Sequence, residues 1–144
     1  MEKTGKDNII FTQNKKTGGR IFEFNKFMPP EREVVKMESK FYEKDKLLVF
    51  KITEDIDDYS VQKIRRKADY EIERYMPRKV VFDFNSVTFM DSAGIGFLIG
   101  RYKFTNMIGG KLEVSNLTQS VKKIFEMSGI LKLIPVTNVK EIIT

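Results

Sequence analysis

The fold is decided by residues 80–98, whose sequence is VVFDFNSVTFMDSAGIGFL. After an apolar pair, Phe82 and Phe84 alternate with polar residues, which favours a central strand with both faces largely covered. From residue 95 onward apolar side chains recur at helical spacing instead, so the strand must end and a helix must begin near Asp91. The stretch therefore predicts a buried strand, a short polar turn and a helix.

Small and polar residues mark the predicted helix start. The first backbone N–H groups of a helix are unpaired and carry partial positive charge, so this position favours a Ser or Asp cap and tolerates an anion. Ser92 is then either an ordinary cap or a place where a phosphate is held. Asp91 either caps the same helix or sharpens the charge contrast at the helix start. Gly94 and Gly96 fit close packing of the helix on the sheet better than a backbone contact with a partner.

The rest of the chain alternates strands with helices. The other predicted elements are a hairpin at 41–52, an amphipathic helix from 61 to just before Pro77, a strand at 111–117, a helix at 118–128, a short strand at 131–136 and a helical turn at 139–144. This order favours a mostly parallel sheet of four to five strands covered by helices, with one antiparallel pair from the hairpin. The predicted fold class is α/β, in one domain at 37–144.

Residues 1–36 are predicted to be an N-terminal extension. The segments 8–13 and 20–24 could pair as a hairpin, and because an isolated hairpin is marginal in water, it either docks on the domain or stays mobile. The stretch beginning at Met37 would make a self-sufficient small domain. Translation starting at Met37, with the first 36 residues an upstream misreading, is therefore the alternative.

Composition excludes several classes of protein. The chain has no Cys and no His, which excludes disulfides, thiol catalysis, thiolate metal sites and a Ser-His-Asp hydrolase. An enzyme acting on a phosphate ester would have only carboxylates, Lys and Ser as catalytic groups. We therefore expect that the protein is not an enzyme and that it binds no cofactor or metal ion. No run approaches the ~18 apolar residues of a membrane span, and the N-terminus lacks the apolar core of a secretion signal, which predicts a cytoplasmic protein without membrane contact.

The net charge of +6 does not indicate a nucleic-acid partner. Residues 1–36 carry 8 basic and 5 acidic side chains and the remainder carries 18 and 15, so each part contributes +3. In the larger part charges of both signs are interspersed, as on a solvated surface and unlike a phosphate-binding stripe.

Three blocks of sequence resemble the STAS domain of bacterial anti-sigma factor antagonists. They are residues 89–96 with the segments 100–103 and 108–110 that follow, residues 121–130, and the acidic turn at 55–57. The blocks fall in the family's order and spacing over about residues 37–144, and they are most similar to the sporulation antagonists of the sigma F pathway.

The resemblance implies a switch by exchange of partners. In that family the unmodified antagonist binds an anti-sigma factor that is also a Ser/Thr kinase and so frees the sigma factor. The kinase uses ATP to phosphorylate the Ser of an Asp-Ser-(Ser/Ala)-Gly motif, which here is Ser92, and a PP2C-type phosphatase reverses the step. Because Ala93 replaces a second Ser, Ser92 carries the motif's only hydroxyl. The partner-binding residues that the resemblance implies are Asp55, Asp57, Asp91, Ser92, Ala93, Gly94 and Gly96.

Some alternatives stay open from the sequence. A STAS scaffold subunit of a larger stress-signalling complex is the second functional class, and light scattering would separate a large assembly from a small switch. Asp55 and Asp57 fit helix capping and partner contact better than acid-base or metal chemistry. Phe97, Phe104 and Met127 fit the core better than an exposed partner surface.

Overall fold

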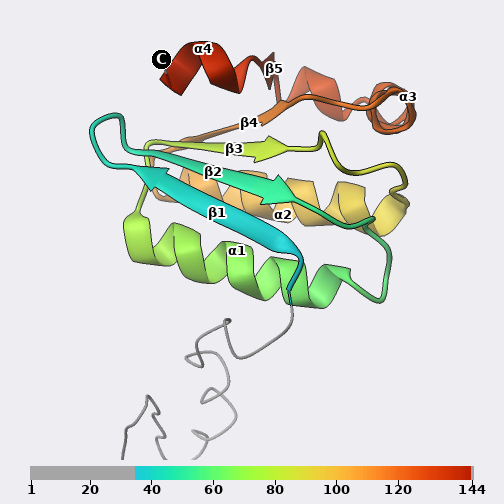
Figure 1. The fold of residues 1–144 in the computed structure, drawn as a ribbon, viewed down its shortest axis with the longest axis horizontal. Coiled ribbons are helices and arrows are strands. Elements are labelled where there is room, and N and C mark those ends of the chain that lie inside the picture. Colours follow the sequence, from blue (N-terminus) through green and yellow to red (C-terminus); the bar gives the residue numbers. More distant parts are fainter. Residues whose placement is uncertain (1–34, 144) are drawn as a thin grey trace, which may run out of the picture. The chain divides into compact units, whose positions relative to one another are not determined.

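The structure is a computed structural model that describes residues 35–143, with side chains as far as Glu141. The predicted hairpin at 8–13 and 20–24 lies outside these residues, and the extension at 1–36 and the domain boundary at residue 37 stay predictions. The elements are β1 (Met37–Tyr42), β2 (Leu47–Ile52), α1 (Val61–Tyr75), β3 (Lys79–Asp83), α2 (Ser92–Met107), β4 (Lys111–Ser115), α3 (Gln119–Ser128), the 3-10 helix η3 (Ile130–Lys132), β5 (Val136–Thr137) and α4 (Val139–Ile143) (Figure 1).

The five strands form one sheet in the order β1-β2-β3-β4-β5. The hairpin strands β1 and β2 are antiparallel, and the pairs β2–β3, β3–β4 and β4–β5 are parallel. The strand β3 at the start of residues 80–98 is therefore central, as its sequence predicts. The α/β class and the mostly parallel sheet are confirmed.

Helices α1 and α2 lie together on one face of the sheet (Figure 1). Beneath them the rings of Phe50 and Phe82 stack with centroids 4.8 Å apart, and Phe97 of α2 meets Phe82 edge-on at 5.3 Å. Arg101 of α2 pairs with Asp69 of α1, with 2.8 Å between Nε and Oδ1. The prediction that Phe97 belongs to the core is confirmed.

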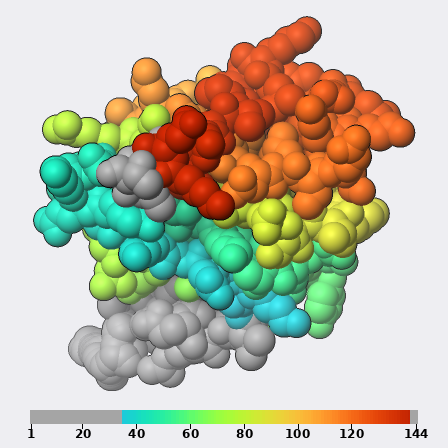
Figure 2. Space-filling view, turned by 45° about the horizontal axis from the view of Figure 1, so that its top comes forward, coloured from blue at the N-terminus to red at the C-terminus, as the bar shows by residue number. Residues whose placement is uncertain are grey.

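The opposite face carries α4 (Figure 1). Val139 of α4 packs with Leu47 and Val81 in a small second cluster on this face. Phe125 of α3 belongs instead to the main core cluster that contains Phe82 and Phe97, and it meets Phe84 edge-on at 5.4 Å. Figure 2 shows α4, in red, lying over this face, with blue-green atoms of β1 and β2 visible beside it.

The end of the chain departs from the predicted strand at 131–136. Gly129 ends α3 in the left-handed region with φ +78°, and the chain continues into η3, where the Lys132 N–H donates to the Gly129 carbonyl at 3.1 Å. Ile130 and Ile134 are both buried, which is a helical spacing and not the alternation of a strand. Only the two residues of β5 pair with β4, so the predicted strand is wrong for most of its length.

Candidate functional site

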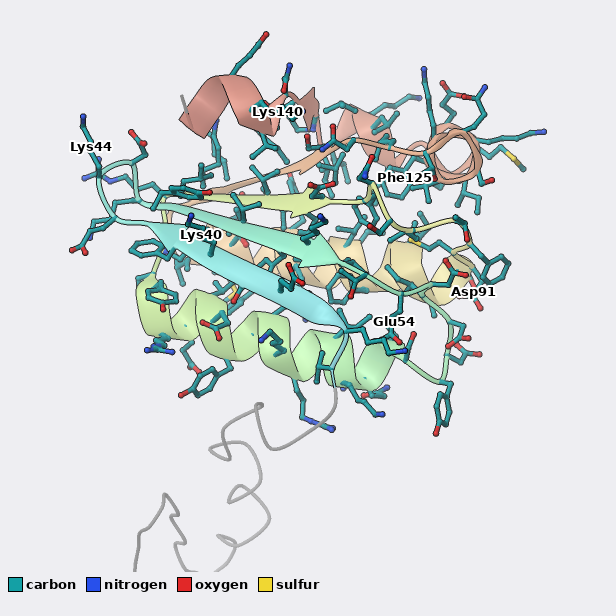
Figure 3. All side chains as sticks on the ribbon, in the orientation of Figure 1. Lys40, Lys44, Glu54, Asp91, Phe125 and Lys140 are labelled. Carbon is teal, nitrogen blue, oxygen red and sulfur yellow. The ribbon has the colours of Figure 1, made fainter. Side chains whose placement is uncertain are left out.

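Two loops at the carboxyl ends of β2 and β3 form one unit. Residues 53–60 connect β2 to α1, and residues 84–91 connect β3 to α2. The Ile56 N–H donates to the Phe89 carbonyl at 3.1 Å, and the Asp91 N–H donates to the Ile56 carbonyl at 3.3 Å, which makes a parallel bridge between the loops. Glu54 and Asp91, one from each loop, lie at the same end of the molecule, opposite Lys44 at the hairpin tip (Figure 3).

The carboxylate of Asp55 ties the first loop to the second. Its Oδ1 accepts hydrogen bonds from the backbone N–H groups of Thr88 and Phe89, both at 2.9 Å, and from the Thr88 hydroxyl at 3.1 Å. The partners stand 33 and 34 residues further along the chain. Asp55 therefore fixes the course of the loop before α2 and does not cap α1.

The carboxylate of Asp57 closes the turn that leads into α1. Its Oδ1 accepts from the N–H groups of Ser60 at 2.9 Å and Tyr59 at 3.0 Å, and the Ser60 hydroxyl accepts in return from the Asp57 N–H at 3.2 Å. This reciprocal pair has the form of a capping box. The hydrogen bond from the Ser60 backbone is the largest cause that lowers the pKa of Asp57. The same Ser60 hydroxyl donates to the Asp55 carbonyl at 3.1 Å, so the two acidic residues share one network.

Helix α2 begins where the sequence predicts. Asp91 is its N-cap, and the Asp91 carboxylate accepts from the Ala93 N–H at 2.9 Å. Ser92 is the first helical residue and is exposed, and among the described residues its hydroxyl has no hydrogen-bond partner. The interpretation of Ser92 as an ordinary cap is therefore wrong, because Asp91 has that role and the Ser92 hydroxyl remains accessible.

The two glycines of the motif have different surroundings. A Cβ on Gly94 would stand 2.2 Å from Cγ of the buried Met90, so this glycine lets α2 approach the loop bridge closely. A Cβ on Gly96 would meet nothing within 4 Å, and Gly96 is exposed. The packing role is confirmed for Gly94 and wrong for Gly96.

Acidic residues surround the start of α2. Glu54, Asp55, Asp57 and Asp58 lie in the first loop, and Asp91 lies in the second. Asp55 and Asp58 are exposed and the other three are partly exposed. This end of the sheet therefore presents negative charge, which favours a partner with positively charged groups.

Two exposed aromatic side chains also lie in these loops, and the sequence analysis did not identify them as functional. Tyr59 is 83% exposed and Phe89 is 52% exposed. An aromatic residue inside an otherwise acidic or polar loop is the signal that could have found them. Met127 on α3, which was expected in the core, is 79% exposed, so that expectation is wrong.

Within residues 35–143 no group of three or more His, Cys, Asp or Glu side chains could hold a metal ion. No helix in this range is long and apolar enough to span a bilayer.

Known proteins resemble this chain in sequence. The STAS domain family matches residues 38–141. The anti-sigma F factor antagonist of Paenibacillus polymyxa is 30% identical over 90 residues, covering 62% of this chain and 77% of that protein. The anti-sigma-B factor antagonist of Bacillus subtilis (strain 168) is 28% identical over 86 residues, covering 60% and 77%.

The same fold occurs in a solved antagonist. The unphosphorylated form of the anti-sigma factor antagonist SpoIIAA superposes with a TM-score of 0.64 at 23% identity, covering 74% of this chain and 92% of that one. The phosphorylated form of the Bacillus SpoIIAA superposes with a TM-score of 0.59 at 22% identity, covering 74% and 96%. With this shared fold and a family match over most of its length, the chain belongs to the STAS domain family.

Proposed function

We propose that the protein is an anti-sigma factor antagonist that is switched off by phosphorylation of Ser92. Relatives from Paenibacillus polymyxa and Bacillus subtilis carry antagonist names, which supports the class of function. The observation that carries the proposal is the state of Ser92, an exposed hydroxyl without a partner among the described residues, at the first position of a helix that Asp91 already caps.

The surroundings of Ser92 suit a phosphate that leaves the fold intact. Phosphorylation adds about −1.5 to −2 charges and three acceptor oxygens at neutral pH. The N-terminus of α2 tolerates that charge, because helix N–H groups and the helix dipole favour an anion there. Ser92 gives up no internal hydrogen bond when it is modified, so the free energy of unfolding should change little.

The same phosphate should act strongly on a bound partner. It would add charge and bulk beside Asp91, at a helix end that we expect the partner to pack against. A partner packed closely against the start of α2 would have to desolvate the phosphate or move away, and burying a charged group costs several kcal/mol. Binding therefore changes while the fold does not.

The partners follow from this class of switch. In its unmodified form the protein binds an anti-sigma factor with Ser/Thr kinase activity and so releases the sigma factor. The kinase transfers the γ-phosphoryl group of ATP to the Ser92 oxygen, the Ser92 hydroxyl proton is lost to a base of the kinase, and ADP leaves. A PP2C-type phosphatase hydrolyses the phosphoserine and restores the binding form. The protein itself performs no chemical step.

Release of sigma factor from its complex with the anti-sigma F factor of the same organism tests the proposal. We expect the wild-type protein to release the sigma factor in the presence of ADP. Ser92→Asp should lose at least about tenfold in affinity for the anti-sigma factor, which corresponds to about 1.4 kcal/mol. Ser92→Ala should release the sigma factor as wild type does and should resist inactivation by ATP. Equal affinity of Ser92→Asp and wild type would overturn the switch.

A further inference from the structure

We infer that Tyr59 and Phe89 are the apolar anchors of the anti-sigma factor interface, and that Asp55 and Asp57 position them. The inference rests on the proposed function and names the side chains that would contact the partner. It also changes the role of the two aspartates, which the resemblance counts among the partner-binding residues.

The exposure of the two rings sets them apart from the core. Tyr59 and Phe89 are 83% and 52% exposed, whereas other aromatic side chains such as Phe82, Phe84 and Phe97 are buried. Single exposed apolar residues are common and need no explanation. Here, however, each of the two loops carries one exposed aromatic residue. The loops are joined by the bridge between Ile56 and Met90, and Met90 lies two residues before Ser92.

The backbones of both aromatic residues are fixed by carboxylates. The Phe89 N–H donates to Asp55 at 2.9 Å, and the Phe89 carbonyl accepts from Ile56 at 3.1 Å. The Tyr59 N–H donates to Asp57 at 3.0 Å. Because the side chains leave from fixed backbone positions, little backbone entropy is lost on binding, which favours tight association.

The two carboxylates make these bonds inside the protein. Oδ1 of Asp55 takes three hydrogen bonds from the second loop, and Oδ1 of Asp57 takes two from its own turn. One carboxylate oxygen of each residue is therefore engaged in holding the loops. Asp55 and Asp57 act as positioning residues, and they also contribute negative charge.

The partner that fits this surface has apolar pockets bordered by basic groups. A few aromatic anchors usually dominate the affinity of an interface, surrounded by contacts that exclude water. Ser92 and the open surface at Gly96 lie beside the bridged loops, and Gly96 leaves room for close approach. A phosphate on Ser92 would place a hydrated anion at this desolvated contact, which explains why one modification would release the partner.

Affinity measurements with the anti-sigma F factor of the same organism, in the presence of ADP, test the anchors. Tyr59→Ala and Phe89→Ala should each weaken binding about 10- to 30-fold, as anchor truncations do. Thermal unfolding should be close to wild type, because both rings are exposed. Met127→Ala is the matched control, since Met127 is 79% exposed but lies on α3, and its affinity should stay within about twofold of wild type.

The outcomes separate this inference from the proposed function. If the wild-type protein fails to bind the anti-sigma factor, or if Ser92→Asp binds it as tightly as the wild type does, the proposed function is wrong. The anchor inference is then wrong as well. If the wild type binds and Ser92→Asp does not, but both aromatic variants bind as the wild type does, the anchor inference alone is wrong.

Discussion

The inner and outer faces of α2 each carry a glycine near the start of the helix, but the two glycines have different roles. On the inner face Gly94 is buried, and an added Cβ would stand 2.2 Å from Cγ of Met90. On the outer face Gly96 is exposed, with nothing within 4 Å of an added Cβ. Ser92 shares the exposure of Gly96. The inner face of the helix therefore supports the fold, and residues on the outer face can be modified without disturbing internal packing.

The difference explains how a switch can act without unfolding the protein. The inner face determines stability, because Gly94, Phe97 and Leu98 pack on the sheet and the loop bridge. The outer face makes few internal contacts, so a modification there has little folding energy to lose. The following substitutions test that separation.

The largest effect on stability is expected from Gly94→Val. The new side chain must displace Met90, whose own side chain is fully buried beside Ile56. Overpacking of this kind typically costs about 1–3 kcal/mol in the free energy of unfolding. Urea denaturation should show a lower midpoint, and a midpoint equal to that of the wild type would mean that the inner face is not tightly packed.

A smaller loss is expected from Asp55→Ala, which removes the link between the two loops. Hydrogen bonds to a charged group contribute about 1.5–3 kcal/mol when shielded. Since Asp55 is exposed, solvent screening should reduce the loss to about 1 kcal/mol. Amide hydrogen exchange at Thr88 and Phe89 should become faster. Asp58→Ala, in the same exposed loop, is the control and should leave stability and exchange unchanged.

The smallest effect, with the opposite sign, is expected from Gly96→Ala. Ala has a higher helix propensity than Gly, and the added methyl group meets open space, so the free energy of unfolding should rise by about 0.5–1 kcal/mol. Affinity for the anti-sigma factor should fall, because the methyl group occupies the open surface beside Ser92. A variant that is less stable than the wild type would contradict the assignment of Gly96 to the outer face.

Much of the fold was predictable from local patterns. The alternation in residues 80–98 identified the central strand β3, and the change to helical spacing located the start of α2 at Asp91 and Ser92. These signals are local, because strand and helix periods are written within a few residues. The prediction of a strand at 131–136 was wrong because a short apolar run is ambiguous. The same run, with Ile130 and Ile134 buried, also fits a 3-10 turn.

The site was predictable only in part, because its decisive contacts are distant in sequence. Nothing near Asp55 indicates that its carboxylate accepts hydrogen bonds from residues 88 and 89. The two glycines of the motif look alike in the sequence, and only the position of Met90 separates their roles. The exposure of Phe89 likewise depends on how the two loops meet.

The central claim is that Ser92 is the site where the switch is set. Its most direct test is the intact mass of the protein after incubation with the anti-sigma F factor of the same organism and ATP, beside the Ser92→Ala variant. The account predicts one added phosphate on the wild-type protein and none on Ser92→Ala. An unmodified wild-type protein, or a phosphate on Ser92→Ala, would contradict it.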